Sequence, residues 1–262
     1  MPSSPTVVAV IPARMASSRF PGKPLTPIAG LPMVEYVRRR ALAAPGIDRV
    51  VVATCDREIL DAVAAHGGEA VMTRDDHERC TTRVAEAVDG IEADIVVLVQ
   101  GDEPLVLPEL LDEVAAPLAT DAGLAATNLL TPLADDAERA SPDIVKAAVG
   151  VGGDVLFFSR GALPFFRERT RVPVFRQTGI MAFSRKGLLD YVDLPETPLE
   201  RAESVDMLRL IEHGLRIRGV VADCATQGVD RPGDVGLVET MLAEDPVQRA
   251  VNGRVLGMEV RS

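Results

Sequence analysis

The chain has 262 residues, 47% of them hydrophobic, and a formal net charge of −11 at pH 7. That hydrophobic fraction can fill a packed core, which excludes a disordered chain. The acidic balance disfavours proteins that follow nucleic-acid phosphates, so no nucleic acid is expected among the partners. No apolar run approaches the roughly 18 residues of a membrane span. Residues 1–14 lack the basic and apolar regions of a signal peptide. We therefore expect a cytoplasmic protein without a membrane partner.

Short β-branched runs alternate with longer helical patterns, which is typical of a parallel α/β sheet with right-handed crossovers. Strands buried on both faces are predicted at 7–11, 49–53, 69–72 and 94–100, with helices at 32–44, 57–68, 81–91 and 108–119. Further along, the pattern predicts strands at 123–130, 179–185 and 217–222, and helices at 186–192, 204–214 and 232–244. Residues 131–178 suit short strands with turns, and signals after residue 245 are weak. Because no linker interrupts the chain, we interpret residues 1–262 as a single domain.

The three cysteines are far apart and form neither a CxxC pair nor a cluster with histidine. This usage favours reduced thiols over a disulfide framework or a zinc site. The chemistry of the chain must therefore come from other residues.

The loop after the first predicted strand, IPARMASSRFPGKPL at 11–25, carries three cations, Arg14, Arg19 and Lys23. Ligands of open parallel sheets bind beyond the carboxyl ends of the strands, which is where this loop lies. Amides around 16–18 and at Gly22 could point at phosphate oxygens, and the cations could add charge-assisted hydrogen bonds. The sequence therefore predicts a phosphate site, while a solvated basic loop remains the alternative.

The usual nucleotide fingerprints are missing from this loop. It is neither the GxxxxGK[ST] of a P-loop nor the GxGxxG of a dinucleotide fold. A nicotinamide dehydrogenase is therefore disfavoured, although Asp56 lies near the position of a ribose-binding acid. A binding or regulatory domain without activity is the second alternative.

The same block resembles the IPAR-x-x-S-x-R-x-PGKPL block of the CMP-KDO synthetases, or 3-deoxy-manno-octulosonate cytidylyltransferases; KDO is 3-deoxy-manno-octulosonate. The likeness extends in family order over about residues 5–240, through VMTRDDH, VQGDEPL, LFFSR and GVDRPGD. The resemblance implies a Rossmann-like nucleotidyltransferase fold with a smaller inserted β-rich region at about 131–185 for the acceptor and dimerisation. It also implies a cytidylyltransferase that uses CTP and Mg²⁺, and a homodimer.

The resemblance also implies the site residues. Asp102 and Asp230 would hold Mg²⁺, and the catalytic set would be Arg14, Lys23, Asp102 and Asp230. CTP would contact Ala13, Arg14, Arg19, Lys23, Thr73, Arg74, Asp76, His77 and Gln100. Taken alone, each of the two aspartates also fits a turn before a proline, and His77 suits a pocket wall better than a catalytic base.

The acceptor half departs from the family pattern. The family's RHLGIYGY is RQTGIMAF here, so Met181 replaces a tyrosine, and Met207 replaces a glutamine. Each buried polar group of the acceptor left unpaired would cost about 1–3 kcal/mol. The nucleotide half also changes: Arg79-Cys80-Thr81 replaces SGT, and Cys55 replaces the aspartate of ATD.

Arginines gather in the same region, at 160, 167, 169, 171 and 176. They favour a small anionic acceptor, although a solvated basic loop is the alternative. The Ala-, Val- and Arg-rich composition also resembles that of high-GC actinomycetes, which make phosphonates. We therefore predict a phosphonate acceptor such as phosphonoformate, with CMP-KDO synthesis as the alternative. The predicted acceptor-binding residues are Arg160, Arg176, Gln177 and Asp206.

Overall fold

The computed structural model describes residues 4–17, 19–168, 172–223 and 227–257. The chain forms two compact units, one made of residues 1–112 and 226–262 and the other of residues 113–225. The predicted subregion at 131–185 lies within the second unit. The assignment of residues 1–262 to one catalytic domain stays a prediction.

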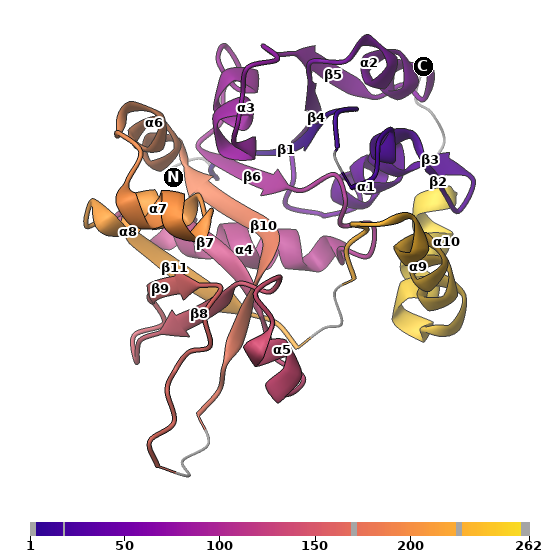
Figure 1. Cartoon of the computed structure of the whole chain (residues 1–262). Coiled ribbons are helices and arrows are strands. Elements are labelled where there is room, and N and C mark those ends of the chain that lie inside the picture. The colour runs from indigo at the N-terminus through magenta and orange to yellow at the C-terminus, as the bar shows by residue number, and fades with distance from the viewer. Residues whose placement is uncertain (1–3, 18, 169–171, 224–226, 258–262) are drawn as a thin grey trace. The chain divides into compact units, whose positions relative to one another are not determined.

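The first unit is built on four parallel strands in the order β6-β1-β4-β5 (Figure 1). Their bounds are β1 Val7–Ala13, β4 Arg49–Thr54, β5 Glu69–Met72 and β6 Ile95–Val99. Valine and isoleucine dominate β1 and β6, every residue of which is buried. The predicted α/β class is therefore confirmed. One detail was wrong: residues 69–72 were expected to be buried on both faces, but β5 is an edge strand whose Met72 is half-exposed.

Helices α1, α2 and α3 pack against these strands (Figure 1). The remaining elements of this unit are η1 Lys23–Leu25, β2 Pro27–Ile28, β3 Leu31–Pro32, α1 Met33–Leu42, α2 Arg57–Ala65, α3 Cys80–Ala87, α9 Pro232–Glu244 and α10 Pro246–Leu256. Helix α4, Pro108–Thr120, contains the boundary between the two units. Helix α10 was not predicted, because its buried face begins with a polar residue, Gln248, ahead of Val251 and Val255.

The second unit has a mixed sheet in which β7 lies between β11 and β10. Strand β11 runs parallel to β7, whereas β10 is antiparallel to it and also pairs with the small β8–β9 hairpin. The elements are β7 Leu124–Pro132, α5 Asp136–Ala140, β8 Lys146–Val149, β9 Val155–Ser159, β10 Phe175–Ser184, α6 Arg185–Asp193, α7 Pro198–Glu203, α8 Met207–Glu212 and β11 Arg216–Val221. The inserted β-rich region is thus present as the β8–β9 hairpin.

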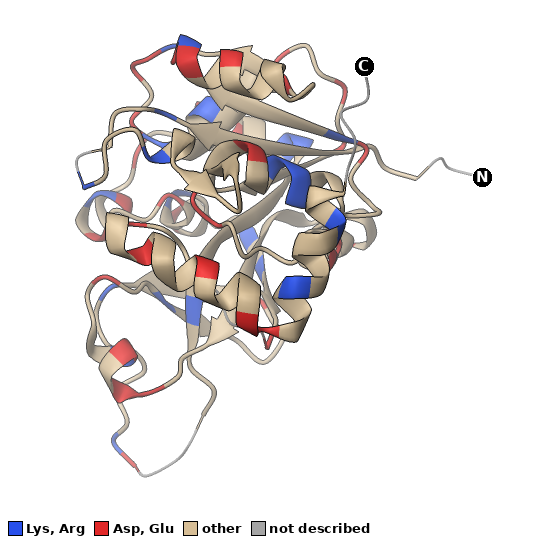
Figure 2. Cartoon of the chain, turned by 90° about the vertical axis from the view of Figure 1, so that its right-hand side faces the viewer, with Lys and Arg blue, Asp and Glu red and all other residues tan. Residues whose placement is uncertain are grey.

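Charged residues of both signs are interspersed along the helices and loops (Figure 2). The net negative charge is therefore not the property of one segment. Among the described residues, no helix has the length and apolarity needed to cross a bilayer.

Candidate active site

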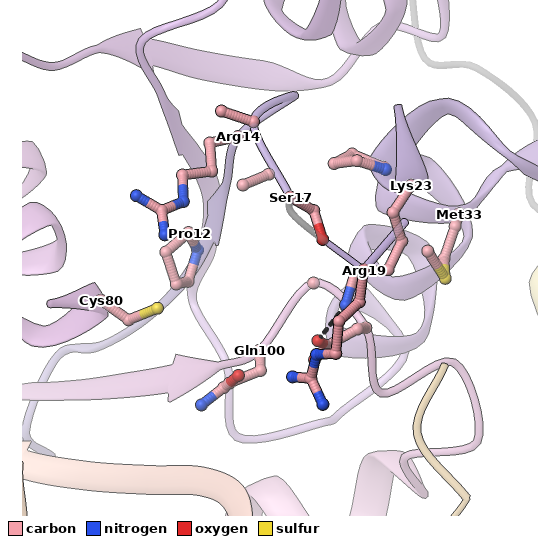
Figure 3. A pocket seen from close by; sticks show the side chains of 13 residues that line it. Pro12, Arg14, Ser17, Arg19, Lys23, Met33, Cys80 and Gln100 are labelled. Carbon is pink, nitrogen blue, oxygen red and sulfur yellow. Dashed lines mark hydrogen bonds and ion pairs between the residues drawn. The ribbon is translucent and has the colours of Figure 1, made fainter. Parts of the chain in front are cut away.

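A cavity of about 240 Å³ opens in the first unit where β1 and β6 end (Figure 3). The loop after β1 contributes Arg14, Arg19 and Lys23 to its wall, and the residues after β6 contribute Gln100 and Asp102. Both segments follow the carboxyl ends of parallel strands, which is the edge where such sheets bind ligands. The loop predicted to bind phosphate therefore lines a cavity and is not only a solvated surface segment.

The sheet holds this loop through Asp56, which follows β4. The Asp56 carboxylate accepts a hydrogen bond of 2.7 Å from the amide of Met15. Within the loop, the amides of Ser17 and Gly22 both donate to the Met15 carbonyl, at 3.0 and 3.2 Å. Gly22 has a φ of 74°, a conformation that glycine adopts at little cost, and the chain then enters η1 at Lys23. Asp56 thus anchors the loop, a role that sequence reasoning missed. Ser18 lies outside the described residues.

Lys23 is the central cation of the cavity wall. Its ammonium donates to Oδ2 of Asp102 at 2.5 Å and to the carbonyl of Val229 at 2.9 Å. The Val229 amide in turn donates to the carbonyl of Asp102 at 2.9 Å. The segments that carry Asp102 and Asp230, 128 positions apart in the sequence, therefore run side by side. This is the proximity that a shared metal site would need.

Arg14 and Arg19 are the exposed cations of the loop. Arg19 forms an ion pair of 3.0 Å with Asp230, and both side chains are more than half exposed. In Figure 3 the side chains of Arg14 and Arg19 extend from the loop, while Gln100 and Cys80 approach the same cavity from other elements. The cavity wall thus combines three cations with the carboxylate of Asp102, and Asp230 lies at its rim through the pair with Arg19.

The predicted nucleotide segment at 73–77 packs against α3. His77 is buried, with Nδ1 3.0 Å from the Thr82 hydroxyl and Nε2 hydrogen-bonded to the Glu86 carboxylate. Burial raises the pKa of Glu86, but hydrogen bonds from His77 and Arg74 outweigh it and hold that pKa below its ordinary value. Both ring nitrogens of His77 are engaged, which does not suit a catalytic base. Its role as a pocket-wall residue stays a prediction, because His77 is not among the residues that line the cavity.

Arg83 is a buried residue of this segment that sequence reasoning missed. Its guanidinium donates to the Thr73 hydroxyl and to the Arg74 carbonyl, the latter at 3.1 Å. Of the predicted CTP contacts, five line the cavity: Ala13, Arg14, Arg19, Lys23 and Gln100. Four lie outside its wall: Thr73, Arg74, Asp76 and His77. Cys80 is the first residue of α3, the helix against which the segment 73–77 packs, and it also lines the cavity.

The predicted acceptor residues all belong to the second unit. Arg160 donates to the carbonyls of Glu203 and Pro142 at 2.8 and 3.0 Å. Arg176 pairs with Glu138 at 3.4 Å, and the Gln177 amide donates to Asn128 at 2.6 Å. The fourth, Asp206, precedes α8 as its N-cap residue. Arg169 and Arg171 lie outside the described residues.

Met181 and Met207 are only 5% and 0% exposed, so they fill the core of the second unit. The prediction of a small acceptor treated these two methionines as lost polar contacts to the acceptor. Buried methionines are ordinary core residues, so these two substitutions do not indicate a smaller acceptor.

Comparison with known proteins identifies the family. Residues 8–217 match the family model described as Cytidylyltransferase. The chain is 43% identical to the 3-deoxy-manno-octulosonate cytidylyltransferase of Syntrophotalea carbinolica, over 90% of this chain and 98% of that protein. It is 40% identical to the enzyme of the same name from Escherichia coli, over 93% of this chain and 98% of that one.

Solved structures agree with this match. A CMP:2-keto-3-deoxy-manno-octonic acid synthetase in complex with CTP has 40% identity and a TM-score of 0.87, covering 92% of this chain and 99% of that one. A 4-diphosphocytidyl-2C-methyl-D-erythritol synthase from Anaerococcus prevotii, 15% identical with a TM-score of 0.64, shares the fold. The chain therefore belongs to the CMP-KDO synthetase family, and it is a CTP-dependent cytidylyltransferase.

Proposed function

We propose that this enzyme transfers CMP from CTP to KDO and releases pyrophosphate. The observation that carries the proposal is the identity of about 40% with KDO cytidylyltransferases over nearly the whole of their length. The burial of Met181 and Met207 removes the main reason to prefer a different acceptor. None of the relatives described above supports the predicted phosphonate acceptor, so the alternative from the sequence is now favoured.

In the proposed reaction, a hydroxyl oxygen of KDO attacks the α-phosphorus of CTP. A new P–O bond forms, the bond to the β-phosphate oxygen breaks, and the hydroxyl proton passes to solvent or a nearby carboxylate. The task of the protein is positioning and charge stabilisation, since no covalent intermediate is needed. Lys23 and Arg14 would hold the triphosphate and stabilise charge on the departing pyrophosphate, and Gln100 would contact the nucleotide.

Asp102 and Asp230 would hold Mg²⁺ in this reaction. The donor set fits the ion, because Mg²⁺ is commonly bound by one or two carboxylates together with phosphates and water. Among the described residues, no group of three or more His, Cys, Asp and Glu side chains could build a denser metal cage. When bound, Mg²⁺ neutralises charge on the phosphates. Lys23 forms an ion pair with Asp102, and Arg19 forms one with Asp230, so both carboxylates lie beside cations.

Acceptor choice can be tested by measuring pyrophosphate release from CTP and Mg²⁺ with KDO or with phosphonoformate. We expect kcat/KM for KDO to exceed that for phosphonoformate by about 10⁴-fold, because a site that pairs with hydroxyl groups rejects ligands that lack them. A reaction without acceptor gives the hydrolytic background. Release with phosphonoformate alone would contradict the KDO assignment and restore the phosphonate prediction.

We also propose a homodimer formed through the second unit. Several large apolar side chains of the β8–β9 hairpin and the following connection are exposed; they are Val151, Leu156, Phe165 and Val172. Large apolar side chains exposed on one part of a chain are typical of protein–protein contacts.

The substitution Phe165→Asp is expected to convert the dimer to a monomer, because it places a charge in the apolar contact. The molar mass measured by light scattering checks this. Leu237→Asp, which places the same charge on an exposed apolar residue of the first unit, is expected to leave the dimer intact. A wild-type protein that is monomeric at micromolar concentration, or a Phe165→Asp variant that stays dimeric, would count against this contact.

A further inference from the structure

The two carboxylates of the proposed metal site lie on segments that are joined at a second place, away from the cavity. Asp102 belongs to the loop 100–106, which follows β6. Asp230 lies two residues before α9, and a single residue, Asp245, separates α9 from α10. Helix α10 packs on α9 and on α1. A contact between α10 and the loop 100–106 would therefore connect the two carboxylate-bearing segments at a second point.

Such a contact exists, and it is buried. Gln248 of α10, 4% exposed, donates from Nε2 to the carbonyl of Leu105 at 2.9 Å. Its Oε1 accepts from Arg40 of α1 at 2.7 Å. Arg40, with no exposed surface, donates from Nε to the carbonyl of Val106 at 2.7 Å and from Nη1 to Tyr36 at 3.2 Å. We name Arg40, Gln248 and the carbonyls of Leu105 and Val106 the buried clamp.

The buried clamp is rigid because its polar groups satisfy one another. A buried guanidinium is costly unless its donors find acceptors, and here all three nitrogens do. Burial lowers the pKa of Arg40, against smaller opposing effects of Tyr36. Loss of one partner leaves a buried carbonyl or donor unpaired, so the loop has little freedom to shift while the clamp is intact.

We propose that the buried clamp sets the position of Asp102 relative to Asp230, with Gln248 as a positioning residue for CMP transfer. Gln248 touches no reacting group. It holds the carbonyl of Leu105, which lies three positions after Asp102 in the chain. The two carboxylate segments meet at the Val229–Asp102 hydrogen bond on one side and at the clamp on the other. This inference rests on the proposed metal-dependent nucleotidyl transfer.

Three variants test this inference. Gln248→Met keeps an unbranched side chain of similar length and good helix propensity but removes both hydrogen bonds of the amide. Gln248→Glu keeps an acceptor for Arg40 and loses the donor to Leu105. Asn252→Ala is the matched control, because Asn252 lies one turn further along α10 and accepts from Tyr36 at 2.9 Å, not from the loop.

We expect kcat to fall by about 10- to 100-fold in both Gln248 variants, because small misplacements of a catalytic group remote from the mutation have effects of this size. Asn252→Ala should stay within about 3-fold of wild type, an effect below that of losing one typical hydrogen bond. Calorimetric binding of CTP separates positioning from general damage. The affinity without Mg²⁺ should be retained in the Gln248 variants, and its strengthening by Mg²⁺ should be reduced.

A folded Gln248→Met variant with wild-type kcat and wild-type Mg²⁺ dependence overturns the inference. If that variant unfolds at the assay temperature, Gln248→Glu replaces it in the test, because its carboxylate pairs with Arg40 and keeps α10 packed. Wild-type kcat and wild-type Mg²⁺ dependence in Gln248→Glu would then overturn the inference. Equal losses in Asn252→Ala also overturn it, because they would reveal a general effect of loosening α10. If the wild-type enzyme is inactive with KDO, the proposed acceptor fails, while the calorimetric comparison with CTP still tests the clamp.

Discussion

Replacing Asp102 by asparagine is expected to lower kcat by about 10²–10³-fold, the range seen when a group that stabilises transition-state charge is removed. The asparagine keeps the size of the side chain but loses the charge that would hold Mg²⁺. The backbone of residue 102 keeps its hydrogen bond from Val229, so the loop should not move. Pyrophosphate release at saturating CTP and KDO measures kcat, and a Mg²⁺ titration should need higher concentrations in the variant.

Asp61→Asn is the matched control for this variant. Asp61 lies on α2 in the same unit, where it forms an exposed pair with Arg57 at 2.9 Å, and it is not among the residues that line the cavity. The same chemical change there should leave kcat at the wild-type level. An Asp102→Asn enzyme that keeps more than about a tenth of wild-type kcat would remove Asp102 from the metal site, since loss of a charge-stabilising group costs more than that.

The strands of the first unit could be predicted almost to the residue because each is a short β-branched run that needs no distant partner to be identified. The predicted strand at 69–72 coincides with β5, for example. The helix predicted at 232–244 likewise coincides with α9. The exposure of β5 could not be predicted, because it depends on which strand ends the sheet. Helix α10 was missed because its buried face includes Gln248, whose partners are more than 140 positions away.

The candidate site also contains residues that could be predicted from the sequence and residues that could not. The cations of the loop 14–23 and Asp102 could be predicted because each directly follows a buried strand, and strand ends mark the ligand edge of the sheet. Asp56, Arg40 and Gln248 could not, because their roles come from hydrogen bonds that join distant segments. The two methionines of the second unit were misinterpreted because a replaced polar residue was taken as a change in the acceptor site, without knowledge of its burial.

A buried ion pair joins helices α7 and α8 of the second unit. Glu200 of α7 has no exposed surface, and both of its carboxylate oxygens accept from Arg209 of α8 at 2.8 Å. Burial lowers the pKa of Arg209, but the hydrogen bond and charge of Glu200 outweigh it and raise that pKa above its ordinary value. The same guanidinium stacks on the ring of Tyr191 at 4.2 Å. This pair holds α7 to α8, the helices on either side of the predicted acceptor residue Asp206.

Glu200→Gln is therefore expected to destabilise the protein by about 3–5 kcal/mol, because removal of one partner leaves the Arg209 charge buried and uncompensated. For a chain of this size, that loss corresponds to a fall in Tm of about 6–20 °C. Thermal unfolding followed by circular dichroism measures it.

Glu196→Gln is the matched control, since Glu196 lies four residues earlier in the chain and pairs with Arg201 at 2.7 Å on the surface. Exposed pairs contribute about 0–1 kcal/mol, so that control should unfold near the wild-type temperature. Equal losses in the two variants would mean that Arg209 finds other compensation, from Tyr191 and the carbonyls around it, and that α7 and α8 do not depend on this ion pair.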